Sequence, residues 1–341
     1  MKKYYDLTAI LSTNAYWNIV LGERSNGKSY AIKKYCFDSY FNKGKEFYYL
    51  RRYTEDIKTN SVQNYFADFV DYLTKISKGA YNEIYVYQRK IYARNKDSKE
   101  KVLIGHYGSI SEYERLKSQQ FPNVENIIFE EFITDRYYIN DTEEPTIAMN
   151  IVSTILRDRV GKVFLVGNLV SQICPYFTEW NLSFIRTMKE GEIVTVNLDG
   201  IKLAIERCLS LNSNSFFFGN AKKSITEGQW ETKIYPRLTN PYKEYEIITQ
   251  IGIDINNLKF VLELLYNEQT NAKVVFIRPY KFATLDRWIS DKYNESNLIS
   301  ICFYTDRCVE KIIVDLINKK KIAYSDNLTA TNFNQILNTI I

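Results

Sequence analysis

A short segment bracketed by two glycines carries the clearest chemistry in this sequence. Gly22 is followed by four residues and then by Gly27, Lys28 and Ser29, and the apolar residues 17–21 come directly before it. This spacing is typical of a phosphate-binding loop between a strand and a helix: backbone N–H groups and the lysine bind phosphates, and the serine hydroxyl binds Mg²⁺. The segment therefore predicts ATP and Mg²⁺ as cofactors, with the cofactor-binding residues Gly22, Arg24, Ser25, Asn26, Gly27, Lys28, Ser29 and Tyr30. The alternative is a surface turn.

Two adjacent acids could complete a hydrolysis site. Glu130 and Glu131 follow the apolar residues 126–129. Hydrolysis needs a carboxylate near Mg²⁺ and a base for the attacking water. We predict that Glu130 joins Ser29 as a metal ligand and that Glu131 orients or deprotonates the water. Asn168 ends the next predicted strand and is a candidate sensor of the water or the γ-phosphate. The alternatives are two solvated acids at a strand end and an asparagine that only forms a turn.

Two arginines bracket the end of a predicted helix. Arg157 and Arg159 lie where the helix that opens at Pro145 ends, and a helix C-terminus favours cations whatever the function. The catalytic alternative is that one of them reaches the ATP of a neighbouring subunit as an arginine finger, because a guanidinium is always charged and suits a spread phosphoryl charge. Arg24, inside the loop, could play this part in cis.

The elements around these residues alternate between strands and helices. Apolar spacing predicts strands at 17–21, 45–50, 126–129 and 162–166, and helices at 29–40, 61–77, 111–118 and 145–156. Between them, period-two alternation predicts strands at 83–94 and 101–105, joined by a polar tip at 95–100. This order predicts an α/β fold with a parallel sheet flanked by helices.

The sequence divides near its last third. A hairpin is expected at 191–206, and residues 210–243 are rich in Asn, Ser, Gly and Pro, which predicts a linker. Beyond it we expect a three-stranded meander, a further strand and two helices at 244–253, 258–266, 272–278, 298–304, 306–318 and 330–340. The predicted domains are 1–209, a nucleotide-binding domain, and 244–341, a smaller α+β or α/β domain.

Composition excludes several classes of chemistry. The 341 residues include five scattered cysteines with no C-x-x-C pair, which favours reduced thiols and argues against a zinc site. His106 is the single histidine, so Ser-His-Asp chemistry and two-histidine metal sites depend on one residue. We see neither a signal peptide nor a membrane-spanning stretch, and we expect a soluble intracellular protein with no membrane partner.

The charge pattern permits a polyanionic partner. The net charge is +5, and residues 241–341 hold 12 basic and 12 acidic side chains, so the excess lies in residues 1–240. Cations and aromatics interleave in the predicted hairpin and again after the acidic pair, which suits a phosphate backbone and stacked bases. Solvated surface charge is the alternative. The candidate DNA-binding residues are Arg89, Lys90, Lys96, Lys99 and Arg136.

The stretch 105–121 and the acidic strand that follows it resemble the large-terminase class of viral DNA-packaging ATPases. A Gly-Ser strand end, a lysine shortly before the acidic strand, and an apolar strand ending in two acids recur there in this order, here at Gly108-Ser109, Lys117 and Glu130-Glu131. The length, the arginine in the phosphate loop and the two-domain plan are most similar to the DNA-encapsidation ATPases of short-tailed, protein-primed podophages. The resemblance covers residues 15–170.

This resemblance implies an ASCE-type P-loop ATPase domain followed by a smaller RNase H-like domain. It assigns ATP, Mg²⁺ and water roles to Lys28, Ser29 and Glu131, and a trans-acting role to Arg157 or Arg159. Glu130 stands where the family usually has Asp, so the side chain at this position is one methylene longer. The resemblance also implies a subunit interface near Arg51, Arg52 and Lys117.

The same resemblance implies an ATP-driven motor that moves double-stranded viral DNA into a preformed procapsid. Its implied partners are further copies of the chain in a homo-oligomeric ring, a pentamer, together with the procapsid portal protein and packaging RNA as a candidate scaffold. The implied location is the host cell cytoplasm, transiently docked on the procapsid. The alternatives are a helicase or AAA-type remodelling ATPase, a scaffold that binds nucleotide only to order an interface, and a terminase with an active nuclease domain.

The nuclease alternative depends on acids in the second domain. An RNase H-like nuclease needs about three converging carboxylates around two metals. The meander offers Glu244, Glu246, Asp254 and Glu263, none of them an Asp in the middle of an apolar strand, and Asp306 is explained by a helix N-cap. We therefore predict a nuclease-like fold without nuclease activity.

Overall fold

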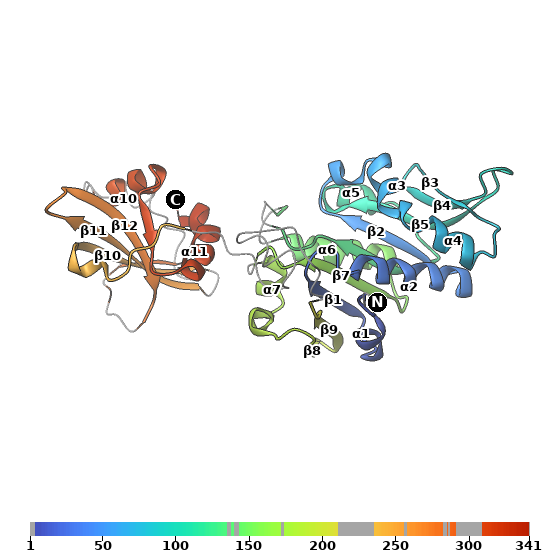
Figure 1. Cartoon of the computed structure of the whole chain (residues 1–341), viewed down its shortest axis with the longest axis horizontal. Coiled ribbons are helices and arrows are strands. Elements are labelled where there is room, and N and C mark those ends of the chain that lie inside the picture. Colours follow the sequence, from blue (N-terminus) through green and yellow to red (C-terminus); the bar gives the residue numbers. More distant parts are fainter. Residues whose placement is uncertain are drawn as a thin grey trace. The chain divides into compact units, whose positions relative to one another are not determined.

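The computed structural model divides the chain into two compact units, Met1–Glu231 and Thr232–Ile341 (Figure 1). The division falls within the stretch 210–243 that we assign to a linker. The structure describes residues 4–134, 138–139, 143–171, 174–210, 235–255, 258–281, 285, 287–290 and 309–340. Each unit is described by itself.

A mostly parallel sheet organises the first unit. Its nine described strands follow the order β3-β4-β5-β2-β6-β7-β1-β9-β8. The six from β5 to β9 pair in parallel, and an antiparallel strand or hairpin extends each edge. The strands are β1 (Trp17–Gly22), β2 (Glu46–Arg51), β3 (Glu83–Tyr87), β4 (Lys90–Arg94), β5 (Lys101–Ser109), β6 (Val124–Glu130), β7 (Lys162–Asn168), β8 (Ile193–Leu198) and β9 (Ile201–Arg207). The placement of β7 between β1 and β6 confirms the ASCE-type α/β fold.

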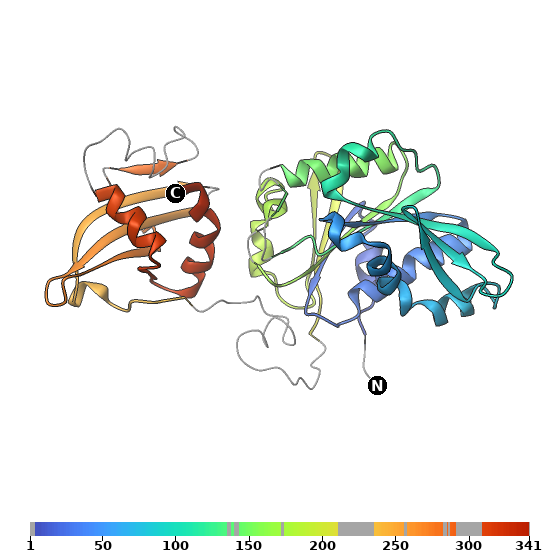
Figure 2. The same ribbon diagram turned by 90° about the horizontal axis from the view of Figure 1, so that it is seen from above.

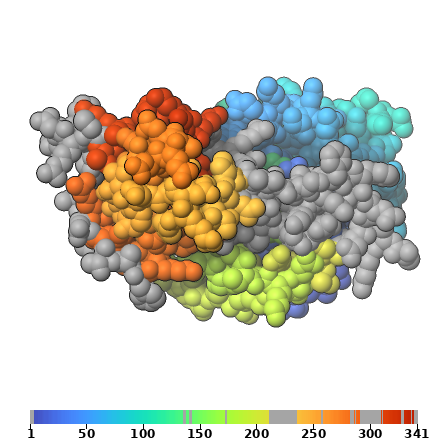
Figure 3. Space-filling view, turned by 60° about the vertical axis from the view of Figure 1, so that its left-hand side comes forward, coloured from blue at the N-terminus to red at the C-terminus, as the bar shows by residue number. Residues whose placement is uncertain are grey.

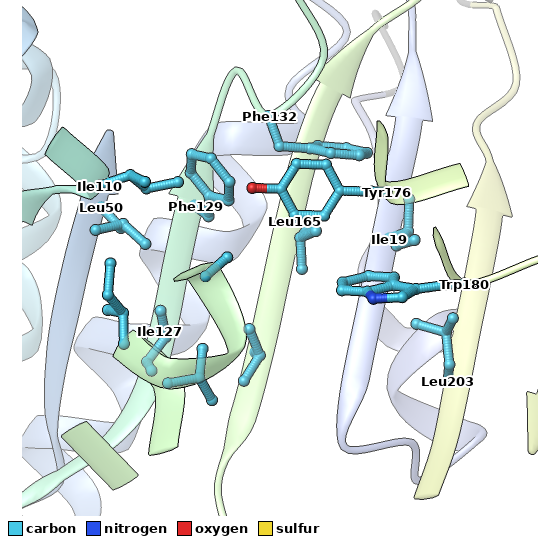
Figure 4. Packing of buried hydrophobic residues seen from close by; sticks show 14 of the residues in the cluster. Ile19, Leu50, Ile110, Ile127, Phe129, Phe132, Leu165, Tyr176, Trp180 and Leu203 are labelled. Atoms are coloured by element: carbon cyan, nitrogen blue, oxygen red, sulfur yellow. The ribbon is translucent and has the colours of Figure 1, made fainter. Parts of the chain in front are cut away.

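Helices cover both faces of this sheet, and alternate strand residues enter the two resulting cores. Val20 and Tyr49 pack with the helices of one face, which are α1 (Thr8–Ser12), α2 (Lys28–Lys43), α3 (Thr59–Ala67) and α4 (Val70–Ile76). Ile19 and Leu50 pack on the other face, beneath α6 (Glu144–Leu156) and α7 (Pro175–Glu179). Figure 4 shows that second core, where Phe129, Phe132 and Tyr176 gather in edge-on ring contacts. The short helix α5 (Tyr113–Leu116) stands where the polar helix 111–118 is predicted.

Two predicted elements are divided in the structure. The predicted strand 83–94 is a hairpin, because Gln88 and Arg89 both take positive φ values, 46° and 61°, and turn the chain between β3 and β4. Neither residue is a Gly or Asn, so the sequence gives no turn signal at this point. The predicted helix 61–77 begins at Thr59 and is interrupted at Asp68 and Phe69, between α3 and α4.

The second unit is a smaller α/β unit built on the predicted meander. Its sheet has the order β13-β10-β11-β12-β14 among the described strands, with β10, β11 and β12 antiparallel and with β13 and β14 parallel to their neighbours. The strands are β10 (Glu246–Ile255), β11 (Leu258–Asn267), β12 (Ala272–Pro279), β13 (Trp288–Ser290) and β14 (Ile322–Tyr324). Helices α10 (Val309–Asn318) and α11 (Asn327–Ile340) pack on it (Figure 2). The predicted strand 298–304 lies outside the described residues.

A buried ion pair stabilises the first unit beside the acidic strand. The Arg52 Nε atom lies 3.1 and 3.0 Å from the two carboxylate oxygens of Glu144, and the two side chains are 4% and 0% exposed. The guanidinium also donates to the carbonyls of Glu131 and Phe132, at 2.9 and 2.6 Å. The Tyr176 hydroxyl donates to Glu144 at 3.0 Å. This pair therefore fixes the backbone that follows β6, and the contacts of the Arg52 guanidinium lie within its own unit.

Replacing Arg52 by methionine should destabilise this unit strongly. Arg52→Met leaves the Glu144 carboxylate buried without its cation, so we expect a loss of about 3–5 kcal/mol in the free energy of unfolding. The double variant Arg52→Met, Glu144→Gln should recover part of the loss, because no unpaired charge stays buried. Urea unfolding followed by tryptophan fluorescence measures both, since Trp17 and Trp180 contact each other in this unit. A loss below about 1 kcal/mol for Arg52→Met would contradict this assignment.

Candidate nucleotide-binding site

The predicted phosphate loop lies between β1 and α2, and its backbone has the required turn. β1 ends at Gly22 and α2 begins at Lys28, directly after Gly27 with φ +96°. A side chain at Gly27 would be strained by this φ value. At Gly22, an added Cβ would lie 2.8 Å from Asn26 Nδ2 and 3.0 Å from Cys208 Cβ. The loop therefore closes tightly on itself, as backbone binding of a phosphate requires.

The Lys28 ammonium is buried among neutral oxygen acceptors. Its Nζ donates to the carbonyls of Gly22 and Glu23, at 3.2 and 2.6 Å, and to the side-chain oxygens of Asn26 and Asn168, at 3.2 and 3.3 Å. The residue is 4% exposed, and burial lowers the pKa of Lys28. A buried cation whose hydrogen-bond acceptors are amide and carbonyl oxygens gains from an anion that can approach it. The loop is therefore prepared for phosphate.

The strand order brings Asn168 and Glu130 to the same edge of the sheet. Gly22 pairs with Asn168 across β1 and β7, and Glu130 pairs with Val166 across β7 and β6. Glu130 is 6% exposed and accepts a hydrogen bond from the Tyr65 hydroxyl at 2.7 Å. Burial raises the pKa of Glu130, while interactions with the nearby Ser29 hydroxyl and with Tyr65 lower it. Hydroxyl and carboxylate oxygens together are donors that Mg²⁺ prefers, so Ser29 and Glu130 fit a metal ligand pair.

Glu131 has a different environment from its neighbour. Its backbone leaves the strand with φ +56°, and its side chain is 57% exposed. The Arg51 Nη2 atom donates to Glu131 Oε2 at 2.6 Å. The same guanidinium nitrogen lies 3.8 Å from Asp56 Oδ2. In this conformation Glu131 is therefore bound to an arginine from the neighbouring strand β2, and a base role requires that it be released.

Comparison with known proteins bears on this site. Residues 1–190 match the family described as Podovirus DNA encapsidation protein (Gp16). The chain belongs to this family. The DNA packaging protein of Bacillus phage phi29 is 32% identical over 181 residues, which cover 52% of this chain and 50% of that protein. That of Bacillus phage B103 is 32% identical over 178 residues, covering 51% and 50%. The chain thus spans about half the length of the curated relatives it matches.

A solved assembly shares the fold over the whole chain. The structure of the bacteriophage Phi-29 viral genome packaging motor assembly includes a chain that aligns with 99% of this one and 99% of its own length, at 20% identity and a TM-score of 0.58. At this identity the likeness shows the fold. The predicted resemblance to podophage DNA-encapsidation proteins is confirmed, as is the predicted fold class.

Arg157 and Arg159 lie at the end of β7 that is opposite to the loop. Both precede β7 at Lys162, whereas β7 reaches the loop at Asn168, about 20 Å further on at strand spacing. Arg159 is bound within the subunit, because it donates to the carbonyls of Phe121, at 2.7 Å, Val124, at 3.2 Å, and Ile155. Arg157 is exposed, with φ +51°. Arg157 therefore lies away from the phosphate loop of its own chain. Arg24 is exposed within the loop.

The other predicted surface residues differ in their environments. Lys90, Lys96 and Lys99 are exposed. Arg89 instead donates to Glu112 at 2.6 Å and to the Ile57 carbonyl at 3.3 Å. On the same hairpin, the Arg94 guanidinium lies 3.9 Å from the ring centre of Tyr85. Arg136 lies outside the described residues. Lys117 is exposed and paired with Glu114, and Tyr30 is 42% exposed beside Phe69.

Sequence reasoning missed three residues that contact the loop or Glu130. The Tyr5 backbone N–H donates to the Asn26 carbonyl at 3.0 Å, and the Tyr5 hydroxyl donates to Glu206 at 2.6 Å. Cys208 is buried against the loop, and burial raises the pKa of its thiol to about 12. Tyr65 is bonded to Glu130 from α3. All three come from segments distant in sequence, and no spacing rule connects them to the loop.

One candidate acid of the second unit, Glu263, is engaged in protein contacts. Glu263 is fully buried, and it accepts hydrogen bonds from Arg278 at 2.8 Å, Gln250 at 2.8 Å and Tyr242 at 2.9 Å. These residues line an open cleft of about 420 Å³ together with Ile247. The surface around β10 is yellow-orange in Figure 3. Within the described part of the chain, no group of three or more His, Cys, Asp or Glu side chains is arranged to hold a metal ion.

We predict that the second unit does not cleave DNA. The Glu263 carboxylate forms an ion pair with the Arg278 guanidinium, so its negative charge is already balanced without a metal ion. Incubation of supercoiled plasmid with the full chain and Mn²⁺ should leave the plasmid intact on an agarose gel. Nicking that disappears in a Glu263→Gln variant would contradict this, whereas nicking that persists in the variant would indicate a contaminating nuclease.

Proposed function

We propose that this chain is an ATP-driven motor that moves double-stranded viral DNA into a preformed procapsid. The observation that carries the proposal is the convergence of Lys28, Asn168 and Glu130 at one sheet edge, from β1, β7 and β6. A phosphate loop alone binds nucleotide, whereas a loop beside a buried acid and a polar sensor can hydrolyse it. Membership in the encapsidation family supports DNA as the substrate that is moved.

Nucleotide binding changes the partners of Lys28. The ammonium exchanges its bonds to the Gly22 and Glu23 carbonyls for the β- and γ-phosphate oxygens, and the N–H groups from Asn26 to Ser29 bind the same phosphates. Ser29 and Glu130 hold Mg²⁺. The metal, when bound, neutralises charge that develops on the phosphoryl oxygens. Asn168, already within reach of Lys28, hydrogen-bonds the γ-phosphate or the attacking water.

Hydrolysis further requires Glu131 to leave Arg51. Once free, its carboxylate accepts the proton of the water that attacks the γ-phosphorus, in the geometry that general-base catalysis demands. The ion pair is solvated on the side of Glu131, which is 57% exposed, whereas Arg51 is 17% exposed. When Glu131 leaves, Asp56, 3.8 Å from the same guanidinium nitrogen, stays as an acidic partner of Arg51. Arg51 thus lies where a change in the neighbouring subunit or in bound DNA could alter turnover.

A neighbouring subunit supplies the further positive charge that stabilises the γ-phosphoryl group during its transfer. Arg157 is exposed at the sheet edge opposite its own loop, so we infer that it acts in trans within a homo-oligomeric ring, a pentamer. Three exposed cations, Lys90 at the start of β4 and Lys96 and Lys99 in the turn between β4 and β5, track the DNA backbone. The procapsid portal protein is the docking partner, and packaging RNA is a candidate scaffold between them.

The motor works in the host cell cytoplasm, transiently docked on the procapsid. Its family supports a role in virion assembly. Among the helices of the described residues, none combines the length and the apolar character needed to cross a bilayer.

Replacing Glu131 by glutamine should separate binding from hydrolysis. Glu131→Gln keeps the size of the side chain but removes the base, so ATP affinity should stay within about twofold while turnover falls by about 10²–10⁴. Lys28→Ala is the matched control and should lose both. Filter binding of radiolabelled ATP and release of phosphate measure the two quantities. Normal turnover by Glu131→Gln would exclude it as the base.

Mixing experiments should identify the arginine that acts in trans. Arg157→Ala alone should release no phosphate. In mixtures with the wild-type chain, the rate of phosphate release should fall by more than the fraction of variant subunits, because each variant subunit also disables the site of a neighbour. Arg159→Ala should lower the thermal unfolding midpoint instead, since Arg159 bonds three main-chain carbonyls. Full activity of Arg157→Ala would refute the trans role.

A further inference from the structure

Tyr65 bonds to the proposed metal ligand from outside the sheet. It lies on α3, and its hydroxyl donates to Glu130 Oε1 at 2.7 Å. The Glu130 carboxylate also lies near the Ser29 hydroxyl at the start of α2, which lowers the pKa of Glu130. The carboxylate is therefore held between a residue of the phosphate loop and a helix from a distant segment. The bond uses part of the acceptor capacity of one oxygen and leaves further lone pairs for a cation.

Two neighbours, Tyr49 and Lys33, hold the Tyr65 ring in place. It stacks on Tyr49 of β2, with ring centres 4.4 Å apart and planes inclined by 22°. The Lys33 ammonium lies 4.4 Å from the Tyr65 ring centre and donates to the Tyr65 carbonyl at 2.8 Å. Lys33 also forms an ion pair with Asp68 at 2.7 Å. Such a restrained ring can fix the position of its hydroxyl.

Lys33 belongs to the helix that begins at the phosphate loop. It follows Ser29 by four residues, so both side chains lie on one face of α2. Contacts therefore run from Lys33 to Tyr65 and from Tyr65 to Glu130, and they join α2, α3 and β6. The lysine side chain is 4% exposed, so these contacts belong to the packed interior of the unit and not to its surface.

We propose that Tyr65 is a positioning residue that fixes the Glu130 carboxylate for magnesium. The inference rests on the proposed function, because it takes Glu130 and Ser29 as the metal ligands. Glu has one more methylene and one more rotatable bond than Asp, so an unrestrained Glu130 would lose more conformational freedom on binding a cation. The Tyr65 hydroxyl removes that freedom in advance, as partners of a metal ligand commonly do.

The variant Tyr65→Phe tests this role with little disturbance. It removes one hydroxyl and keeps the ring on Tyr49 and beneath Lys33. A fluorescent ATP analogue is titrated into the full chain in EDTA, and Mg²⁺ is then titrated at a fixed concentration of the analogue. We expect the affinity in EDTA to stay within about twofold, and the Mg²⁺ concentration at half-maximal binding to rise by about tenfold or more. Tyr72→Phe is the matched control, because its hydroxyl bonds Asp38 on the same face of the sheet. It should match the wild type in both titrations.

The outcomes separate this inference from the proposed function. If the wild-type chain shows no Mg²⁺-dependent binding, or if Lys28→Ala binds as well as the wild type, the proposed function fails. If the wild type behaves as expected and Tyr65→Phe has the same Mg²⁺ midpoint, the positioning role is overturned. A Tyr65→Phe variant that loses affinity equally in EDTA and in Mg²⁺, with a lowered unfolding midpoint, would also overturn it, since that pattern indicates a purely structural residue.

Discussion

The parallel order β6-β7-β1 is the constraint on which the site depends. Parallel strands end at one edge of a sheet, so this order alone brings Glu130, Asn168 and the phosphate loop together. The loop must then bury an ammonium, and the structure satisfies Lys28 with carbonyl and amide oxygens, with no acid among those hydrogen-bond acceptors. This arrangement favours a phosphate, because the hydrogen-bond acceptors of Lys28 within the described part of the chain are neutral oxygens.

Glu130 and Glu131 are adjacent in the sequence, but the backbone turn between them places their side chains in different environments. Glu130 ends β6 and is buried beside Ser29, whereas Glu131 turns with φ +56° and binds Arg51 at the surface. The backbone at this turn is held by Arg52, whose buried pair with Glu144 lies directly behind it. The stability of the unit and the geometry of the site therefore depend on the same few contacts.

Local signals predicted much of the fold and the centre of the site. The glycine spacing placed the loop, and apolar periodicity placed β6, β7 and α6 to within one or two residues. Features that depend on tertiary contacts could not be predicted. Gln88 and Arg89 form a turn with neither Gly nor Asn, Arg159 bonds carbonyls brought near by the fold, and Tyr65 reaches Glu130 from another helix. Nothing in the spacing of these residues indicates their partners.

Stimulation of ATP hydrolysis by DNA tests the central claim most directly. Phosphate release by the full chain is measured with Mg²⁺, with and without long duplex DNA at low salt, where contacts to the DNA backbone are strongest. We predict turnover that rises with duplex DNA and that is absent in Lys28→Ala under both conditions. Turnover equal to that of Lys28→Ala, or unaffected by duplex DNA, would contradict a motor that couples this site to DNA.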